Sequence, residues 1–150
     1  MSRILVAVDD SDASRRAAAF VDGFFHGQDD VSIVALNVAH VPVEWMPAVP
    51  YGTVAPWPAA PTADRAAVEE AMAREEGEAE AMTAARAPQG AEVEVVFGET
   101  VDAILTAAEE EGADLVVVGS NDKGFLQRLF GGSVAEDLTR RSPRPVLVVP

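Results

Sequence analysis

The chain has 150 residues and no cysteine, and its 25 acidic side chains outnumber its 11 basic ones, for a formal net charge of −14. The lack of cysteine excludes disulfide frameworks, thiol nucleophiles and cysteine-ligated metal centres. The negative charge argues against binding to nucleic acid or to an anionic membrane, and no segment reaches the ~20 apolar residues of a membrane span. We therefore expect a soluble, cytoplasmic protein with one domain over residues 1–150.

The expected elements alternate between strands and helices along the chain. Apolar or alternating runs predict strands at residues 4–8, 33–38, 92–97, 115–118 and 146–149. Helical patterns cover residues 12–25, 62–85, 101–111 and 134–141, with Thr100 and Ser133 as expected N-caps and Gly112 as a stop signal. This alternation predicts an α/β fold in which a doubly wound five-stranded parallel sheet carries helices on both faces.

Residues 39–61 form an expected long loop. The segment contains six prolines together with Trp45, Tyr51 and Trp57, which excludes a helix interior or a central strand. Loops of this length are often functional, so the two tryptophans either contact a partner or only pack the loop onto the body. The following helix carries six glutamates, which we interpret as a solvent-exposed face.

Two loops carry the residues that point to a ligand. In open parallel sheets, ligands bind beyond the carboxyl ends of the strands, next to the central strand. Asp9 directly follows the first strand and could accept hydrogen bonds from a ribose hydroxyl or an adenine amine, or it could only cap the next helix. After the fourth strand, a glycine-containing polar loop ends in Gly132 and Ser133, which open a helix and suit an anion.

These motifs resemble the universal stress protein family. The family's loop pattern G-x2-G-x9-G-[ST] matches at Gly119, Gly132 and Ser133, and the Asp9 segment, Gly98 and the closing residues 142–149 add further similarity. The resemblance implies the strand order 3-2-1-4-5 and an adenine nucleotide, ATP or AMP, as ligand. The implied nucleotide-binding residues are Val8, Asp9, Val38, Val118, Gly119, Asn121, Asp122, Gly132, Ser133 and Val134.

The resemblance also implies a role for each part of this set. Adenine would contact Asp9 and the backbone of Val38, and the ribose would lie near Gly119. The phosphates would bind the amides of residues 132–134 and the Ser133 hydroxyl.

Asp122 departs from the family pattern, which has a glycine at this position. A carboxylate ~4 Å from a phosphate charge would repel it by on the order of 4 kcal/mol at an effective dielectric constant near 20. Lys123 and Arg128 could offset this repulsion, and a bridging Mg²⁺ could reverse its sign. Two interpretations stay open: a stress-response module that binds an adenine nucleotide, or a dimeric protein-interaction module that binds none.

Enzymatic turnover is not indicated. Neither His26 nor His40 fits the order of a catalytic triad, and the chain has no phosphate-binding GK[ST] motif. At most we expect slow ATP hydrolysis.

The last strand is expected to form a homodimer interface. In the order 3-2-1-4-5 it lies at an edge of the sheet, and an exposed edge invites pairing with a second copy of the chain. The interface residues would be Val146, Leu147, Val148 and Val149. A further protein partner is expected but not identified.

Overall fold

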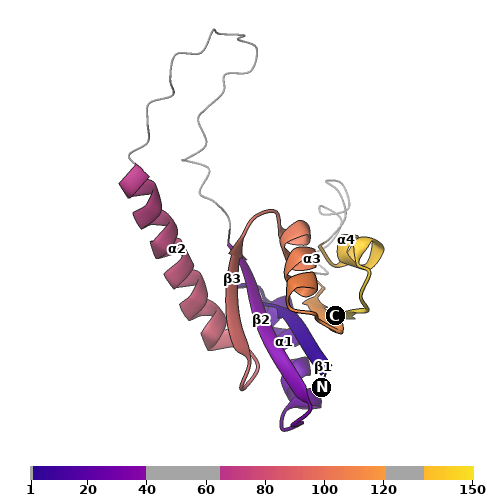
Figure 1. Ribbon diagram of the computed structural model, residues 1–150. Helices are drawn as coiled ribbons and strands as arrows, with labels where there is room; N and C mark the ends of the chain where they lie inside the picture. Colours follow the sequence, from indigo (N-terminus) through magenta and orange to yellow (C-terminus); the bar gives the residue numbers. More distant parts are fainter. Residues whose placement is uncertain (1, 40–64, 121–133) are drawn as a thin grey trace.

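The computed structural model describes residues 2–39, 65–120 and 134–150 (Figure 1). The elements in chain order are β1 (Ser2–Ala7), α1 (Asp12–Phe25), β2 (Val31–Ala39), α2 (Arg65–Arg86), β3 (Glu92–Phe97), α3 (Thr100–Glu110), β4 (Leu115–Gly119), α4 (Val134–Arg141) and β5 (Val146–Val149). Every expected strand and helix is present, and the boundaries differ by two residues at most among the described positions. The proline-rich segment 40–61 and the expected N-cap Ser133 lie outside the described residues.

The five strands form one parallel sheet in the order β3-β2-β1-β4-β5, which confirms the expected fold. β1 is central, and Leu5 lies opposite Val34 on one side and Val116 on the other. α1 lies over β4 and also contacts β1 and β5, whereas α2 packs on β2 and β3. α3 and α4 cover the other face (Figure 1).

Side chains of β1 alternate between two hydrophobic layers because successive residues of a strand point to opposite faces. Ile4 and Val6 pack under α1 together with Ala17 and Val21. Leu5 packs on the opposite face in the layer that contains Ile104 of α3 and Leu138 of α4. Each layer is therefore sealed by helices, as a parallel sheet requires.

The start of α3 differs from the expected N-cap. Glu99, not Thr100, caps the helix: its backbone is extended (φ −74°, ψ 134°), and its carboxylate accepts a hydrogen bond from the Asp102 N–H at 2.8 Å. Thr100 is already the first helical residue, so its hydroxyl is not in the capping position. The expected stop is confirmed, because Gly112 follows the helix with a left-handed φ of +60°.

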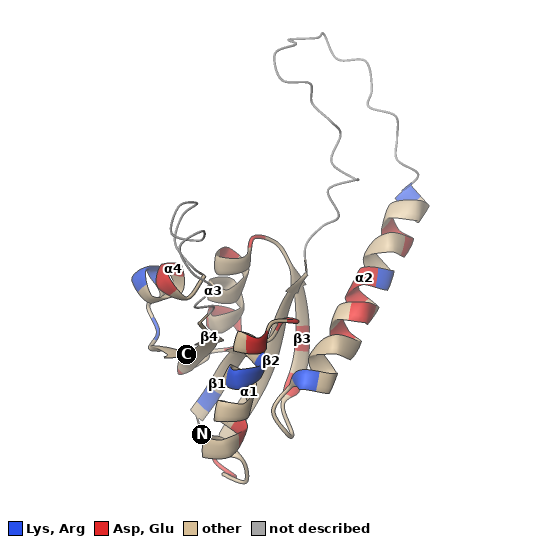
Figure 2. Ribbon diagram, turned by 180° about the vertical axis from the view of Figure 1, so that it is seen from behind, with Lys and Arg blue, Asp and Glu red and all other residues tan. Residues whose placement is uncertain are grey.

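α2 is the least buried helix of the described chain. Of its 22 residues, Ala79 and Thr83 are the buried ones, and its first turns extend beyond the sheet (Figure 1). Acidic positions recur along its length (Figure 2), in agreement with the expected solvent-exposed face. Among the described residues, no helix combines the length and hydrophobicity needed to span a membrane.

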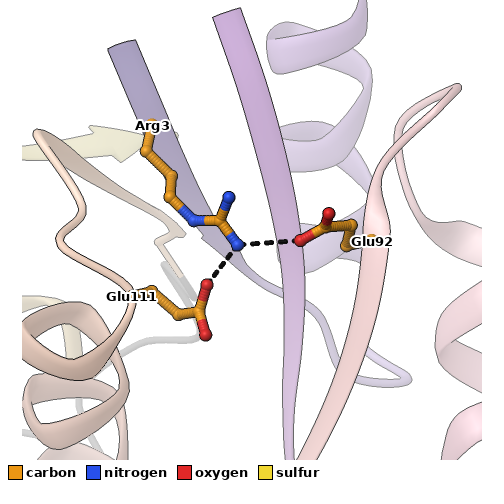
Figure 3. Close-up of polar contacts among 3 residues, drawn as sticks. All are labelled: Arg3, Glu92 and Glu111. Carbon is orange, nitrogen blue, oxygen red and sulfur yellow. Dashed lines mark hydrogen bonds and ion pairs between the residues drawn. The ribbon is translucent and has the colours of Figure 1, made fainter. Parts of the chain in front are cut away.

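A cluster of charged residues joins three elements at the amino-terminal edge of the sheet. Arg3 of β1 lies between Glu92 of β3 and Glu111 after α3 and forms ion pairs with both (Figure 3); the Glu92 contact is 2.8 Å. The hydrogen bond to Glu111, followed by that to Glu92, raises the pKa of Arg3. Glu94 lies nearby, and burial together with repulsion from Glu111 and Glu110 raises the pKa of its carboxyl group.

Candidate functional site

A cavity of about 180 Å³ lies where the carboxyl ends of β1, β2 and β4 meet the first turns of α1, α3 and α4. Its lining residues are Ala7, Val8, Asp9, Ser11, Ser14, Leu36, Val38, Thr100, Ile104, Val118, Gly119, Val134 and Ala135. The structure thus brings together all six described residues of the expected nucleotide site: Val8, Asp9, Val38, Val118, Gly119 and Val134. The other four expected residues, Asn121, Asp122, Gly132 and Ser133, lie outside the described residues.

Hydrogen bonds fix the segment between β1 and α1. The Asp9 N–H donates to Ser14 Oγ at 2.9 Å, and the Ser11 N–H donates to Asp9 Oδ1 at 2.8 Å. Ser11 in turn caps α1, because its Oγ accepts from the Ser14 N–H at 3.1 Å. Asp9 therefore supports the turn before the helix, while its Oδ2 has no hydrogen-bond partner among the described residues.

Asn37 positions the same segment from β2, although no role at the site was predicted for it from the sequence. Its side chain is 5% exposed, and Nδ2 donates to the Val8 carbonyl at 2.7 Å. The Val8 N–H donates to the Leu36 carbonyl at 2.8 Å, so both backbone polar groups of Val8 are bonded to β2 although β1 has already ended. An amide in an otherwise apolar buried strand was the available signal, since a buried polar side chain needs a partner.

Gly119 allows α1 to approach the end of β4. A Cβ atom at this position would lie 2.2 Å from both the carbonyl carbon and the carbonyl oxygen of Ala13, and 2.8 Å from the Ser14 nitrogen. A side chain here would therefore collide with the backbone of the first helical turn. The close approach of the α1 backbone therefore accounts for a glycine at position 119, whether or not a ribose lies beside it.

The far wall of the cavity comes from α3, which the sequence did not connect with the site. Thr100 and Ile104 are one turn apart on this helix and face Leu36 and Val38 at the end of β2. Ile104 is 1% exposed and belongs to the buried layer under α3. Apolar walls with a few polar groups at the rim suit a flat, largely apolar group such as a nucleobase.

Asp9 is the one charged residue among the described lining residues of the cavity. Glu136 and Asp137, in the first turn of α4, do not line the cavity, and both pair with Arg140. No lysine or arginine occurs among the described lining residues, and the nearby Arg86 reaches only the Asp9 carbonyl, at 3.4 Å. The described ranges contain no group of three or more acidic or histidine side chains arranged to hold a metal ion.

Comparison with known proteins supplies the family. The model of the universal stress protein family matches residues 1–150. The chain belongs to this family. A universal stress protein of Thermus aquaticus is 32% identical over 148 residues, which cover 97% of this chain and 96% of that protein. Universal stress protein MJ0577 of Methanocaldococcus jannaschii is 40% identical over 55 residues, and this match spans only 34% of that protein's length.

Solved structures of universal stress proteins share the fold. The structure of MJ0577 aligns with a TM-score of 0.68 and 24% identity, covering 99% of this chain and 94% of that one. A universal stress protein in complex with cAMP aligns with a TM-score of 0.59 and 22% identity, covering 99% and 96%. An Arabidopsis thaliana family member with AMP bound aligns with a TM-score of 0.61 and 15% identity, covering 99% and 91%.

Proposed function

We propose that this universal stress protein binds an adenine nucleotide in the cavity at the carboxyl ends of β1, β2 and β4. One observation carries the proposal: the six described residues that the family motif marks for nucleotide contact all line one cavity. Two structural relatives hold cAMP and AMP, respectively, which supports adenine as the base.

The described part of the cavity would hold the base and the sugar. Its volume is about 180 Å³, and the residues expected to bind the phosphates, other than Val134, lie outside the described residues. Adenine would occupy the apolar part near Val38 and Ile104 and offer its amine to Asp9 Oδ2 or to backbone carbonyls. The ribose would lie near Gly119, and the phosphates would extend toward the amides of residues 132–134.

Charge selects among the nucleotides. The phosphate charges would approach Asp9, the one charged residue among the described lining residues, and Asp122 would add a further carboxylate. The repulsion grows with the charge of the nucleotide, so AMP binds without a metal and ATP binds together with Mg²⁺.

The protein then works in the cytoplasm as a nucleotide-responsive stress module.

The same proposal includes a homodimer through β5. This strand is an edge of the sheet, and antiparallel pairing with the β5 strand of a second copy would close the edge. Replacing the half-buried Leu147 with lysine should give folded monomers, as measured by light scattering and circular dichroism; Val149 is left unchanged because it is buried under α1. A dimer that survives the change would place the interface elsewhere.

The nucleotide proposal is tested first on the purified wild-type protein. Excess absorbance at 260 nm and mass spectrometry would identify a nucleotide that copurifies, and calorimetry with AMP, cAMP and ATP, each with and without Mg²⁺, would measure affinity. Failure of all three nucleotides to bind at millimolar concentration would overturn the proposal.

A pair of matched variants tests the location of the site. Ala7→Leu places a larger side chain in the cavity, whereas Ala84→Leu makes the same change at an exposed position of α2. We expect Ala7→Leu to weaken nucleotide binding by at least about tenfold, equivalent to ~1.4 kcal/mol, and Ala84→Leu to leave it unchanged. Circular dichroism checks that both variants fold, and equal affinities in folded variants would place the nucleotide elsewhere.

Asp122→Gly separates repulsion from metal bridging. If the carboxylate repels phosphate, the variant binds ATP more tightly, above all without Mg²⁺. If the carboxylate binds Mg²⁺, the variant loses affinity for ATP only when Mg²⁺ is present.

A further inference from the structure

An aromatic pair on α1 is the most exposed large hydrophobic feature of the described chain. The rings of Phe20 and Phe24 stack with centroids 4.4 Å apart and an interplanar angle of 23°. Phe20 packs partly into the layer under α1, but Phe24 is 64% exposed, more than any other large hydrophobic side chain of the described residues. The stack with Phe20 leaves most of the Phe24 side chain exposed to solvent.

The pair lies on the flank of α1 that faces the β5 edge of the sheet. Residues 16, 20 and 24 follow a spacing of four and therefore share one side of the helix. Toward the amino-terminal end of this flank, Arg16 Nε donates a hydrogen bond to the Pro150 carbonyl at 2.8 Å, just beyond the end of β5. On the opposite flank, the Asp22 carboxylate accepts from the Gln89 N–H at 2.9 Å, beside the start of β3.

β5 can pair with a second copy in one simple register. Its inner carbonyls are those of Pro145 and Val149, which accept from the N–H groups of Val116 and Ser120 at 3.0 and 2.7 Å. Because alternate residues point to opposite sides, the backbone groups of Val146 and Val148 face outward. A twofold axis at Leu147 would pair Val146 of each copy with Val148 of the other.

Strand pairing alone is a weak basis for a dimer. A ladder of so few residues exchanges hydrogen bonds with water and leaves little net stabilisation, whereas association costs translational and rotational freedom. The net charge of −14 per chain adds repulsion between copies. The interface therefore needs additional apolar area on a surface without carboxylates.

The flank of α1 beside β5 meets both needs. Its exposed or half-exposed residues after the first turn are Arg16, Ala19, Phe20, Gly23 and Phe24, none of them acidic, and residues 142–150 contain no acidic side chain either. By contrast, acidic positions recur along α2, which packs over β2 and β3 toward the opposite edge of the sheet (Figure 2). Two copies can approach through the β5 edge without opposing carboxylates at these positions.

The expected spacing of the helices matches large side chains. α1 lies over β4, and in a continuous sheet of two copies three strand spacings of ~4.8 Å would separate the two β4 strands, about 14 Å in all. Helices in close contact lie ~8–10 Å apart, so about 4–6 Å remains to be filled between the two α1 helices. Phe20 and Phe24 are the large side chains on that flank.

We propose that Phe20 and Phe24 of α1 form the aromatic part of a homodimer interface, packing against the same pair of a second copy above the joined β5 strands. This proposal rests on the β5 dimer of the proposed function and assigns to α1 the apolar contact that the strand lacks.

Sedimentation equilibrium of the full chain tests the contribution of the pair. Phe24→Ser should weaken the dimer by about 10- to 100-fold, the range expected for a buried aromatic contact, and Phe24→Leu by much less. Met72→Ser, on the distant α2, is the control for loss of an apolar side chain and should leave the dimer unchanged. A Phe24→Ser dimer as tight as the wild type would overturn the α1 contact while leaving the β5 dimer in place.

Cross-linking tests the geometry independently of affinity. Because the chain has no cysteine, Ala19→Cys introduces a single thiol on the flank, and Ala84→Cys introduces one on α2. A short bismaleimide should link Ala19→Cys dimers in high yield and Ala84→Cys dimers poorly. Dimers that form but do not link at position 19 would overturn the proposal, and a wild type that stays monomeric would overturn it together with the β5 dimer, but not the nucleotide site.

Discussion

Replacing Gly119 with alanine should disturb the contact on which the cavity depends. The added Cβ would lie 2.2 Å from the Ala13 carbonyl group, and ordinary van der Waals contact begins at 3.4 Å. The first turn of α1 would therefore have to move by 3.4 − 2.2 = 1.2 Å, because backbone atoms cannot rotate away as a flexible side chain can. The Cβ would also lie 2.8 Å from the Ser14 nitrogen, whose residue accepts the Asp9 hydrogen bond.

The expected loss of stability combines two effects. Overpacking of a well-packed site costs about 1–3 kcal/mol, and one weakened hydrogen bond adds ~1 kcal/mol, so we expect a decrease of about 2–4 kcal/mol in the free energy of unfolding. For a chain of this size, that corresponds to a decrease in Tm of about 4–16 °C. Thermal unfolding followed by calorimetry or circular dichroism measures it.

Gly23→Ala is the matched control on the same helix. An added Cβ at Gly23 has no atom within 4 Å, and this glycine is inside α1. The substitution should raise stability by ~0.5–1 kcal/mol through helix propensity alone. A Gly119→Ala protein that melts within 2 °C of the wild type would refute the close-packing explanation.

Three further substitutions test other parts of the structure. Glu94→Gln should raise Tm at pH 7 and progressively less toward pH 4, because a carboxyl group whose pKa is raised by burial destabilises the fold when it is ionised; a gain that grows on acidification would contradict this. Asn37→Leu should lower the free energy of unfolding by about 1–3 kcal/mol in urea titrations, since the buried Val8 carbonyl loses its side-chain donor. Glu99→Ala should lower the free energy of unfolding by ~0.5–2 kcal/mol in the same titrations. A larger decrease from Thr100→Ala would indicate that Thr100 caps the helix.

The fold was predictable because hydrophobic periodicity reports directly on burial. The apolar runs of β1 and β4 are buried on both faces, so a continuous apolar pattern predicts them as strands whatever side chains pack against them. Capping was less predictable: Thr is statistically preferred at an N-cap, but the backbone angles that make Glu99 the cap are invisible in the sequence.

The candidate site was predictable only in part. Asp9 and Gly119 follow strands whose carboxyl ends must meet, so topology alone brings them together. Ile104 and Thr100 enter the site because α3 crosses back over the sheet, a tertiary contact that local patterns do not encode. Gly119 illustrates a further limit: its role as a ligand contact stays a prediction, and the sequence did not indicate that a Cβ at this position would collide with the backbone of α1.

The central place of β1 has a consequence for synthesis on the ribosome. β1 is made first, but one of its two neighbours, β4, begins only at Leu115, and the Arg3 carbonyl accepts its hydrogen bond from the Asp114 N–H at 2.8 Å. At ~5–20 residues per second, the ribosome needs about 5–20 seconds to proceed from the end of β1 to the start of β4. During that interval the edge of β1 that β4 later covers is unpaired, and unpaired apolar strand edges of this kind make folding intermediates prone to aggregation.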